Sequence, residues 1–424
     1  MLGRRARLAL LLWLALLGVT AGCSSTTDSL GEDESAVTPP TKPRQTLVPL
    51  VGPDAYENPF HDLLGVTTQV IDKHVEDAFQ QLFHGDPDTE AIYFTMGDDE
   101  ALIKDVYHDD TRSEGVGLAM LIAVELDKRD EFDKLWRYAK RELRYATGSN
   151  EGYFRSYCDT ESSSAACVDP YGAQQFAMSL ILAHDRWTTL GDIDYGADAL
   201  DVLDVMLHKQ EQNGGISEDG VTNTFDTETE LVFDVPNTSA ASRTRPSILM
   251  PAYYELWGQA TGNAFFKSAA ASARNFLPLA AHPKTGLLPV RSYFDGTPVP
   301  GADTFRPEAY RVFPNLVLDQ IWTQGGAWEV TEFNRVLQFF VDQGIDSYGT
   351  SYELDGTVVS SARETSLVVV NGVTASRSTI AEQSRHDFIQ AVWDMPTATG
   401  SARYYTGIMQ LFALLVLSGK MQVL

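Results

Sequence analysis

The stretch Ser113–Val124, with the sequence SEGVGLAMLIAV, decides the fold class. Beyond Gly115 it contains no polar side chain, so a helix here would be apolar on nearly every side. Such a helix must be covered by several neighbours instead of lying on a surface. Ile408–Leu417 has the same character near the C-terminus. The two stretches therefore predict an inner, deeply buried set of helices.

Outward from these stretches, apolar residues recur at helical spacing, mostly in segments that short loops join in pairs. We predict eleven helices, at residues 66–83, 113–128, 130–146, 172–190, 195–211, 247–260, 264–279, 307–323, 329–344, 378–394 and 402–418. Longer loops are expected at residues 147–171, 212–246, 280–306 and 345–377.

Two of the longer loops contain strand-like runs, Glu230–Phe233 and Thr365–Val370. Paired helices with a more buried inner set predict an all-α architecture, a closed ring of helical hairpins. A helical solenoid is the alternative. It would show a self-similar repeat of about 34–47 residues, and the sequence shows none.

The N-terminus has the pattern of an export signal. Three arginines precede Leu8–Val19, an uncharged run too short to span a membrane comfortably. Small residues and Cys23 follow, so residues 1–22 are predicted to be a signal peptide. Cys23 resembles the lipidated first residue of a bacterial lipoprotein, although an ordinary cleaved signal is the alternative. We expect an exported lipoprotein, held on the periplasmic or cell-surface side of a membrane only by its lipid.

Residues 23–47 are polar and rich in proline, which predicts a flexible tether. No second linker is visible, so residues 48–424 are expected to form one domain. The formal net charge of −26 argues against a nucleic-acid partner, because phosphate binding needs a basic face. The charge suits a neutral or cationic substrate. We expect a monomer.

Several catalytic motifs are missing from the sequence. It has no GxSxG elbow, P-loop, HExxH or paired CxxC, and its histidines show no metal-ligand spacing. These absences argue against serine hydrolases, nucleotide triphosphatases and zinc proteases. We expect neither a metal nor an organic cofactor.

Glu114 is the first candidate for catalysis. With Thr111 it matches a capping box, in which the glutamate returns to the backbone at the helix start. A carboxyl at the start of a buried helix could instead be a general acid, and Asp109 and Asp110 could help to keep it protonated.

Glu308 is the second candidate. Pro307 fits the first position of a helix, so Glu308 falls in the first turn, where it could simply compensate the helix dipole. Arg311 lies three residues further on and is expected to pair with Glu308. An ionised carboxylate of this kind suits a base that activates water.

Asp169 is the third candidate. It follows Cys158 and Cys167, and an exported protein can oxidise such a pair. A disulfide would stiffen the loop that presents Asp169. A loop acid without a chemical role is the alternative. Aromatic residues near these segments could stack on sugar rings, although most aromatics in such helices belong to the core.

These motifs together resemble glycoside hydrolase family 8, and within it the reducing-end xylose-releasing exo-oligoxylanases, over most of residues 57–424. Asp109–Gly115 resembles the family's D-D-x-R-T-E-G, whose glutamate is the general acid. Phe305–Val312 resembles Y-D-A-x-R-V, whose aspartate is the base. Arg403–Gly407 resembles the closing R-Y-Y-D-G.

The resemblance implies an (α/α)6 barrel that hydrolyses β-1,4 linkages with inversion. It implies that Glu114 is the acid and Glu308 the base, with Asp169 positioning the sugar or the water. Further substrate contacts are expected from Tyr107, Arg112, Tyr310, Arg311, Tyr404 and Tyr405.

The sequence also departs from the family pattern. Glu308 is one methylene longer than the family's aspartate, although inverting enzymes hold their carboxyls roughly 6.5–9.5 Å apart to admit a water. Arg245 stands where the family often has Asp or Asn, and Thr406 replaces an aspartate. Asp169 matches its family position only approximately.

We therefore predict an inverting hydrolase of β-1,4-linked oligosaccharides, with xylo-oligosaccharides as the first expectation. Chitosan fragments, β-glucans and the choice between exo and endo action remain open. A catalytically inactive lipoprotein that binds oligosaccharides is the alternative. A polysaccharide lyase on a similar ring is disfavoured, because the chain is too acidic for an anionic polymer.

Overall fold

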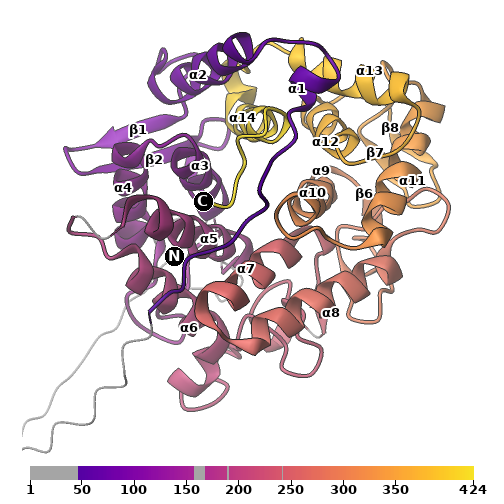
Figure 1. Ribbon diagram of the computed structural model, residues 1–424. Coiled ribbons are helices and arrows are strands. Elements are labelled where there is room, and N and C mark those ends of the chain that lie inside the picture. Colours follow the sequence, from indigo (N-terminus) through magenta and orange to yellow (C-terminus); the bar gives the residue numbers. More distant parts are fainter. Residues whose placement is uncertain (1–45, 157–167, 189–190, 241) are drawn as a thin grey trace, which may run out of the picture. The chain divides into compact units, whose positions relative to one another are not determined.

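The computed structural model describes residues 46–156, 168–188, 191–240 and 242–424 (Figure 1). The predicted signal peptide, Cys23 and nearly all of the tether lie outside these residues, as do Cys158 and Cys167. Residues 45–424 form one compact unit. No helix in the described part of the chain is long and apolar enough to cross a membrane.

Two concentric layers of helices make up this unit, and the chain alternates between them (Figure 1). The inner helices are α3 (Ser113–Glu125), α5 (Pro170–Trp187), α7 (Pro251–Thr261), α10 (Val312–Trp322), α12 (Thr365–Ala375) and α14 (Arg403–Leu417). The outer helices are α2 (Thr68–His84), α4 (Arg129–Tyr138), α6 (Tyr195–Gln212), α8 (Ala264–Ala280), α11 (Ala327–Gln343) and α13 (Glu382–Trp393).

Each inner helix contacts the next one, and α14 contacts α3, which closes the ring. The two layers differ in burial, as the distribution of apolar residues in their sequences predicts. Every residue of α3 from Gly115 to Glu125 is buried, whereas α2 buries one face only, from Ile71 to Phe83. An apolar stripe suffices for an outer helix, but an inner helix is covered on all sides. The predicted (α/α)6 barrel is confirmed.

The prediction for Thr365–Val370 was wrong, because this run forms the first half of the inner helix α12. Its consecutive valines favour a strand locally. The run does not alternate between apolar and polar residues, however, and all of Ser366–Ala375 is buried. An apolar environment on every side stabilises the helix here. Glu230–Phe233 is not a strand either and makes only one isolated bridge, from Val232 to Phe225.

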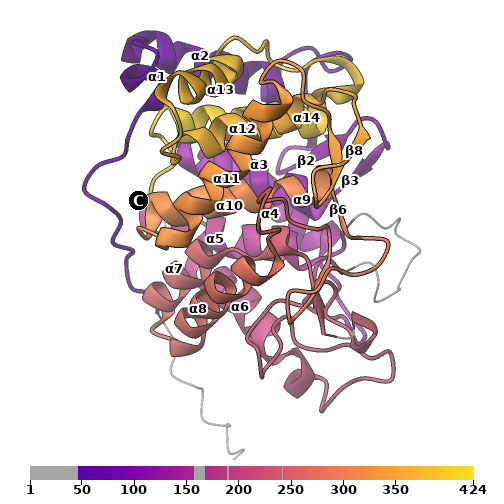
Figure 2. The same cartoon turned by 90° about the vertical axis from the view of Figure 1, so that its right-hand side faces the viewer.

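Short antiparallel sheets gather at one end of the barrel, where Figure 2 shows β3, β6, β8 and α9 (Pro307–Tyr310) away from the C-terminus. The first sheet has the order β1-β2-β3 and immediately precedes α3. The others have the orders β4-β5 and β6-β7-β8. Their bounds are β1 Tyr93–Met96, β2 Glu100–Asp105, β3 Asp110–Thr111, β4 Arg243–Thr244, β5 Ser292–Tyr293, β6 Thr304–Phe305, β7 Ser351–Glu353 and β8 Val358–Ser360.

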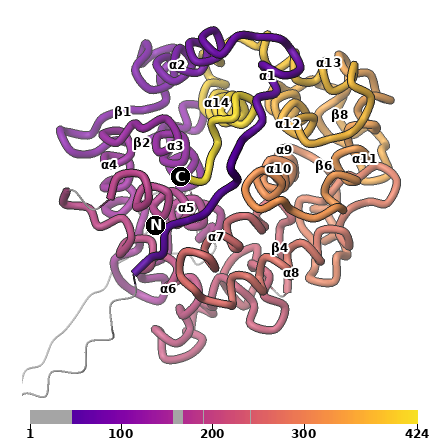
Figure 3. The backbone as a smooth tube through the Cα atoms, viewed as in Figure 1, coloured from indigo at the N-terminus to yellow at the C-terminus, as the bar shows by residue number. Residues whose placement is uncertain are grey.

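Both ends of the described chain run across the opposite end of the barrel (Figure 3). The segment that leads to α1 (Pro59–Asp62) is fixed there by hydrogen bonds. The amide of Val48 donates to the carbonyl of Ala260 at 2.8 Å, and the amide of Val423 donates to the hydroxyl of Tyr56 at 2.8 Å. The two terminal segments thus cover the end of the barrel away from the sheets.

Candidate active site

The predicted acid, base and positioning residues all come from the starts of inner helices or just before them. Glu114 is in the first turn of α3, Asp169 is the N-cap of α5, and Arg311 separates α9 from α10. Tyr404 and Tyr405 open α14. The barrel topology brings these points together, because its inner helices run in the same direction.

Arg311 and Glu114 form an ion pair, in which Nη1 of Arg311 donates to Oε1 of Glu114. The arginine side chain is only 8% exposed, and its guanidinium lies 4.9 Å from the centre of the Tyr171 ring. Burial opposes its charge, but Glu114 and Tyr405 outweigh burial and raise the pKa of Arg311. A permanent positive charge therefore sits beside the predicted acid.

The expected pair between Arg311 and Glu308 was wrong. Glu308 instead contacts the Nε of Arg306 at 3.2 Å, and its side chain is 49% exposed. The short helix α9 ends before Arg311, which points into the barrel, whereas Glu308 stays on the rim. Sequence spacing alone could not predict that the side chains of Arg311 and Glu308 point in different directions.

The capping-box interpretation of Glu114 was also wrong. The N-cap of α3 is Arg112, which makes no side-chain cap, and Thr111 belongs to β3, opposite Lys104. The Glu114 side chain is therefore directed to Arg311 and not back to its own backbone. The capping box therefore does not explain Glu114, and its role as the acid stays a prediction.

Asp169 accepts two hydrogen bonds on Oδ1, from the amide of Tyr171 at 2.8 Å and from Nη2 of Arg245 at 2.9 Å. Burial alone would raise the pKa of this carboxyl. The charge of Arg245, the Tyr171 amide and the charge of Arg311 outweigh burial and hold the pKa of Asp169 below its usual value. Asp169 is therefore a fixed negative charge and not a proton donor.

Tyr405 is influenced by the charges of both predicted catalytic carboxyls. Burial raises the pKa of Tyr405, Arg311 opposes the rise, and Glu114, Glu364 and Glu308 add to it. Both Glu114 and Glu308 are thus within electrostatic reach of one phenol. Tyr404 is buried and lies so close to Gly115 that a side chain at that position would collide with its ring.

The other predicted contact residues differ in exposure. Tyr107 is 73% exposed beside the ring of His108, and Arg112 pairs with Asp110 at 3.1 Å and Asp105 at 3.3 Å. Tyr310 has no exposed surface, and its hydroxyl contacts Thr350. Its predicted contact with substrate stays a prediction.

Sequence reasoning missed one carboxyl of the site. Glu364 is the N-cap residue of α12 and accepts hydrogen bonds from Thr350 Oγ1 at 2.8 Å and Ser366 Oγ at 2.9 Å. It was overlooked because α12 was predicted to be a strand inside a loop. The alternation of inner and outer helices around the ring is the signal that could have located it.

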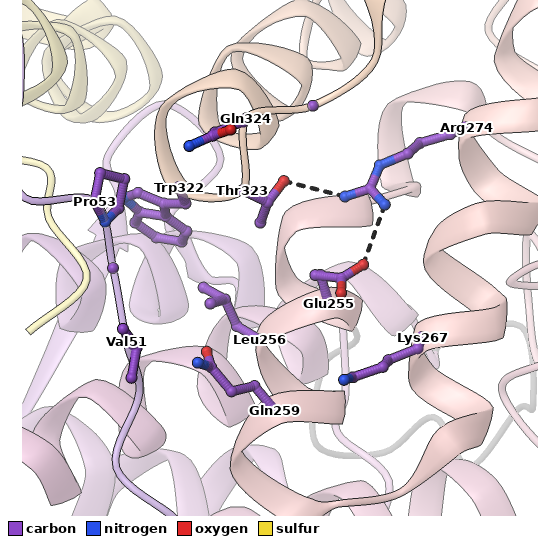
Figure 4. Close-up of a pocket in the computed structure, with 12 residues that line it drawn as sticks. Val51, Pro53, Glu255, Leu256, Gln259, Lys267, Arg274, Trp322, Thr323 and Gln324 are labelled. Atoms are coloured by element: carbon purple, nitrogen blue, oxygen red, sulfur yellow. Dashed lines mark hydrogen bonds and ion pairs between the residues drawn. The ribbon is translucent and has the colours of Figure 1, made fainter.

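Within the described ranges, no group of three or more His, Cys, Asp or Glu side chains could hold a metal ion. A cavity of about 450 Å³ lies at the opposite end of the barrel, where Arg274 contacts Glu255 and Thr323 (Figure 4). The predicted disulfide of Cys158 and Cys167 stays a prediction.

A comparison with protein families matches residues 103–419 to the family described as glycosyl hydrolases family 8. This range contains every predicted catalytic residue. The chain is a member of glycoside hydrolase family 8.

Among its family 8 relatives is a reducing end xylose-releasing exo-oligoxylanase of Halalkalibacterium halodurans, 31% identical over 87% of this chain and 94% of the relative. Endoglucanase 2 of Ruminiclostridium josui is 25% identical over 73% of this chain and 64% of the relative. The structure of Rex8A from Paenibacillus barcinonensis in complex with xylose is similar, with a TM-score of 0.79 and 31% identity. That similarity covers 87% of this chain and 97% of Rex8A.

Membership of family 8 makes the chain a glycoside hydrolase. The arrangement of its polar residues suits such chemistry, because it offers a recessed carboxyl at Glu114 and a solvent-facing one at Glu308. Proton donation to a leaving oxygen and activation of a water require two carboxyls in different environments.

Proposed function

We propose that this family 8 enzyme hydrolyses β-1,4-linked xylo-oligosaccharides with inversion of the anomeric configuration. The observation that carries the proposal is the contrast between two carboxyls, a recessed Glu114 paired with Arg311 and a half-exposed Glu308 beside Arg306. The relatives named as xylose-releasing exo-oligoxylanases, matched along most of the chain, support the choice of sugar.

Glu114 is the proposed general acid. Its side chain is 20% exposed and recessed among Tyr404, Tyr405 and Arg311, where a glycosidic oxygen could meet it without bulk water. Arg311 holds the carboxyl in a single orientation. A bound sugar would compete for this contact, since catalytic hydrogen bonds often reach their final geometry only with substrate present.

Glu308 is the proposed general base. Its position on the short rim helix α9 leaves half of the side chain in contact with solvent, which gives an attacking water access to it. Glu308 is one methylene longer than the family's aspartate, and its helix α9 is separated from α10 by Arg311 alone. Asp169 is the proposed fixed charge that orients the sugar or the water.

Anomeric proton NMR tests the proposal directly. Xylo-, cello- and chitosan oligosaccharides would be incubated with wild type, Glu114→Gln and Glu308→Gln, with Glu382→Gln on the outer helix α13 as a matched control. Fresh α-anomer from xylo-oligosaccharides, lost in both site variants and kept in the control, is the expected result. Release of the β-anomer would contradict inversion.

The same experiment decides between hydrolysis and binding without turnover. The replacement of the family's aspartate by Glu308 is the observation that favours an inactive oligosaccharide-binding protein. Shifts of the protein's own NMR signals on adding xylotriose, with no new anomer after days, would establish that alternative. Turnover of cello- or chitosan oligosaccharides alone would keep the chemistry and replace the sugar.

A further inference from the structure

Arg245 lies between two carboxylates and is itself largely covered. Its side chain is 13% exposed, and those of Asp169 and Asp234 are 16% and 10% exposed. Nη2 lies 2.9 Å from Oδ1 of Asp169, and Nε lies 2.8 Å from Oδ1 of Asp234. One guanidinium therefore contacts both carboxylates at once.

The chain of charges continues by one more step. The second oxygen of Asp234 lies 2.6 Å from Nε of Arg291, which is 39% exposed. Four alternating charges thus lead from the N-cap of α5 to the surface, in the order Asp169, Arg245, Asp234 and Arg291.

These residues come from separate parts of the chain. Asp234 lies in the long loop after α6, Arg245 follows β4, and Arg291 directly precedes β5. The two loops are also joined by the pairing of β4 with β5, and the amide of Asp234 donates to the carbonyl of Arg243 at 2.8 Å. The chain of charges therefore ties the long loops to the residue beside the predicted catalytic carboxyls.

Arginine is suited to this position because its planar fork can satisfy two acceptors in fixed directions. Among the described residues, the charged groups that act on Asp169 are Arg245, which contacts it, and Arg311, whose charge also reaches it. Arg311 is shared with Glu114, so Arg245 is the partner that Asp169 does not share with the predicted acid. Without the guanidinium of Arg245, Asp169 and Glu114 would compete for Arg311.

We infer that Arg245 is a positioning residue of the active site, which fixes the Asp169 carboxylate in its charged form and orientation and frees Arg311 for Glu114. The part of this inference that concerns turnover rests on the proposed function. It concerns one of the residues at which this chain departs from the family pattern, and Asp234 and Arg291 anchor it to the two long loops.

The test compares wild type, Arg245→Gln and Arg245→Lys in the full chain, by the pH dependence of xylo-oligosaccharide hydrolysis. In Arg245→Gln the acidic limb of kcat/KM, which the base Glu308 sets in wild type, should become steeper and move to higher pH, because Asp169 loses its opposite charge and then titrates in the same range. In Arg245→Lys the limb should stay near that of wild type, while kcat falls about 10- to 100-fold because the fork geometry is lost. An unmoved limb in the first variant or an undiminished kcat in the second would overturn the inference.

A matched control is available at the far end of the barrel. Arg274 makes a comparable buried pair with Asp319, at 2.7 Å. Arg274→Gln should lower the melting temperature and leave the pH profile of hydrolysis in place. If it moved the profile as Arg245→Gln does, the effect would be one of general destabilisation and the inference would fail.

Thermal unfolding separates this inference from the proposed function. Melting temperatures would be measured for Arg245→Gln, Asp169→Asn and the double variant. The fall in melting temperature of the double variant should be smaller than the sum of the falls of the two single variants. This difference should be larger at pH 7 than at pH 3. This measurement needs no turnover. Absence of hydrolysis by wild type would refute the proposed function, whereas additive losses at both pH values would refute the inference.

Discussion

Arg311 contacts Glu114 across the mouth of the barrel, although 197 positions separate the two residues in the sequence. The contact joins the start of α3 to the start of α10 and places a buried positive charge beside the predicted acid. It also leaves Glu308 with Arg306 as its charged neighbour. The two predicted catalytic carboxyls thus have different cations, one recessed and one at the rim.

Replacing Arg311 should be costly for both stability and activity. Arg311→Met would leave Glu114 and Asp169 with one cation fewer in a buried site, and breaking a buried pair typically costs about 3–5 kcal/mol. Chemical denaturation measures this free energy of unfolding. Arg306→Met removes an ion pair that is half-exposed and should cost less than about 1 kcal/mol. Equal losses from the two variants would contradict the structural assignment of Arg311.

Shortening the predicted base should reduce turnover. Glu308→Asp restores the residue type of the family but withdraws the carboxylate by one methylene on a backbone that presents a glutamate. A misplacement of about 1 Å can cost on the order of 100-fold in rate, so kcat should fall about 10- to 100-fold. Steady-state hydrolysis of xylotriose measures it. A kcat at or above that of wild type would show that the backbone is already placed for aspartate.

Gly115 should tolerate no side chain. A Cβ built there meets the ring and hydroxyl of Tyr404, and both residues are buried. Gly115→Ala should therefore destabilise the protein by about 1–3 kcal/mol and impair turnover, because it pushes α14 away from Glu114. Gly326→Ala is the control, since the nearest atom to its Cβ is 4.0 Å away. A well-folded, fully active Gly115→Ala variant would contradict this packing.

Stability should decline between acidic and alkaline pH because of two buried glutamates on α11. Burial, reinforced by Asp319, raises the pKa of Glu329 to about 8, and burial raises that of Glu332 to about 7 despite Arg335. Both folded-state values lie above the usual glutamate value near 4.5. Their contribution is therefore complete below about pH 4.5 and is lost as the pH rises to about 7 and 8.

Melting temperatures measured from pH 5 to pH 9 test this expectation. The decline for wild type should be on the order of several degrees. It should be much shallower in a Glu329→Gln/Glu332→Gln variant, because the glutamines do not titrate. Parallel curves for the two proteins would show that other groups govern the pH dependence.

Export and lipid attachment at Cys23 remain a prediction. Expression in a bacterium supplied with labelled fatty acid should give a labelled, membrane-associated protein for wild type. Cys23→Ser should be unlabelled and should leave the membrane fraction. Labelling that survives this substitution, or a wild type found only in soluble fractions, would contradict the prediction.

The sequence by itself determined most of the fold. The apolar stretches at Val116–Val124 and Ile408–Leu417 lie within helices α3 and α14, and all eleven predicted segments contain helix. It also located Glu114, Glu308 and Asp169 as candidates, because motif and local spacing are properties of neighbouring residues. Its one large error was α12, where a valine-rich run favours a strand locally and burial on all sides stabilises a helix.

Only the tertiary structure decided which charges meet. Spacing of three residues placed Arg311 beside Glu308, yet the end of α9 turns Arg311 into the barrel towards Glu114. The contact of Arg245 with Asp169 likewise joins residues 76 positions apart. Such pairs depend on how whole helices and loops are placed in the ring, because charges interact according to their distance in space. The local sequence determines where the helices form, whereas closure of the barrel brings the residues of the site together.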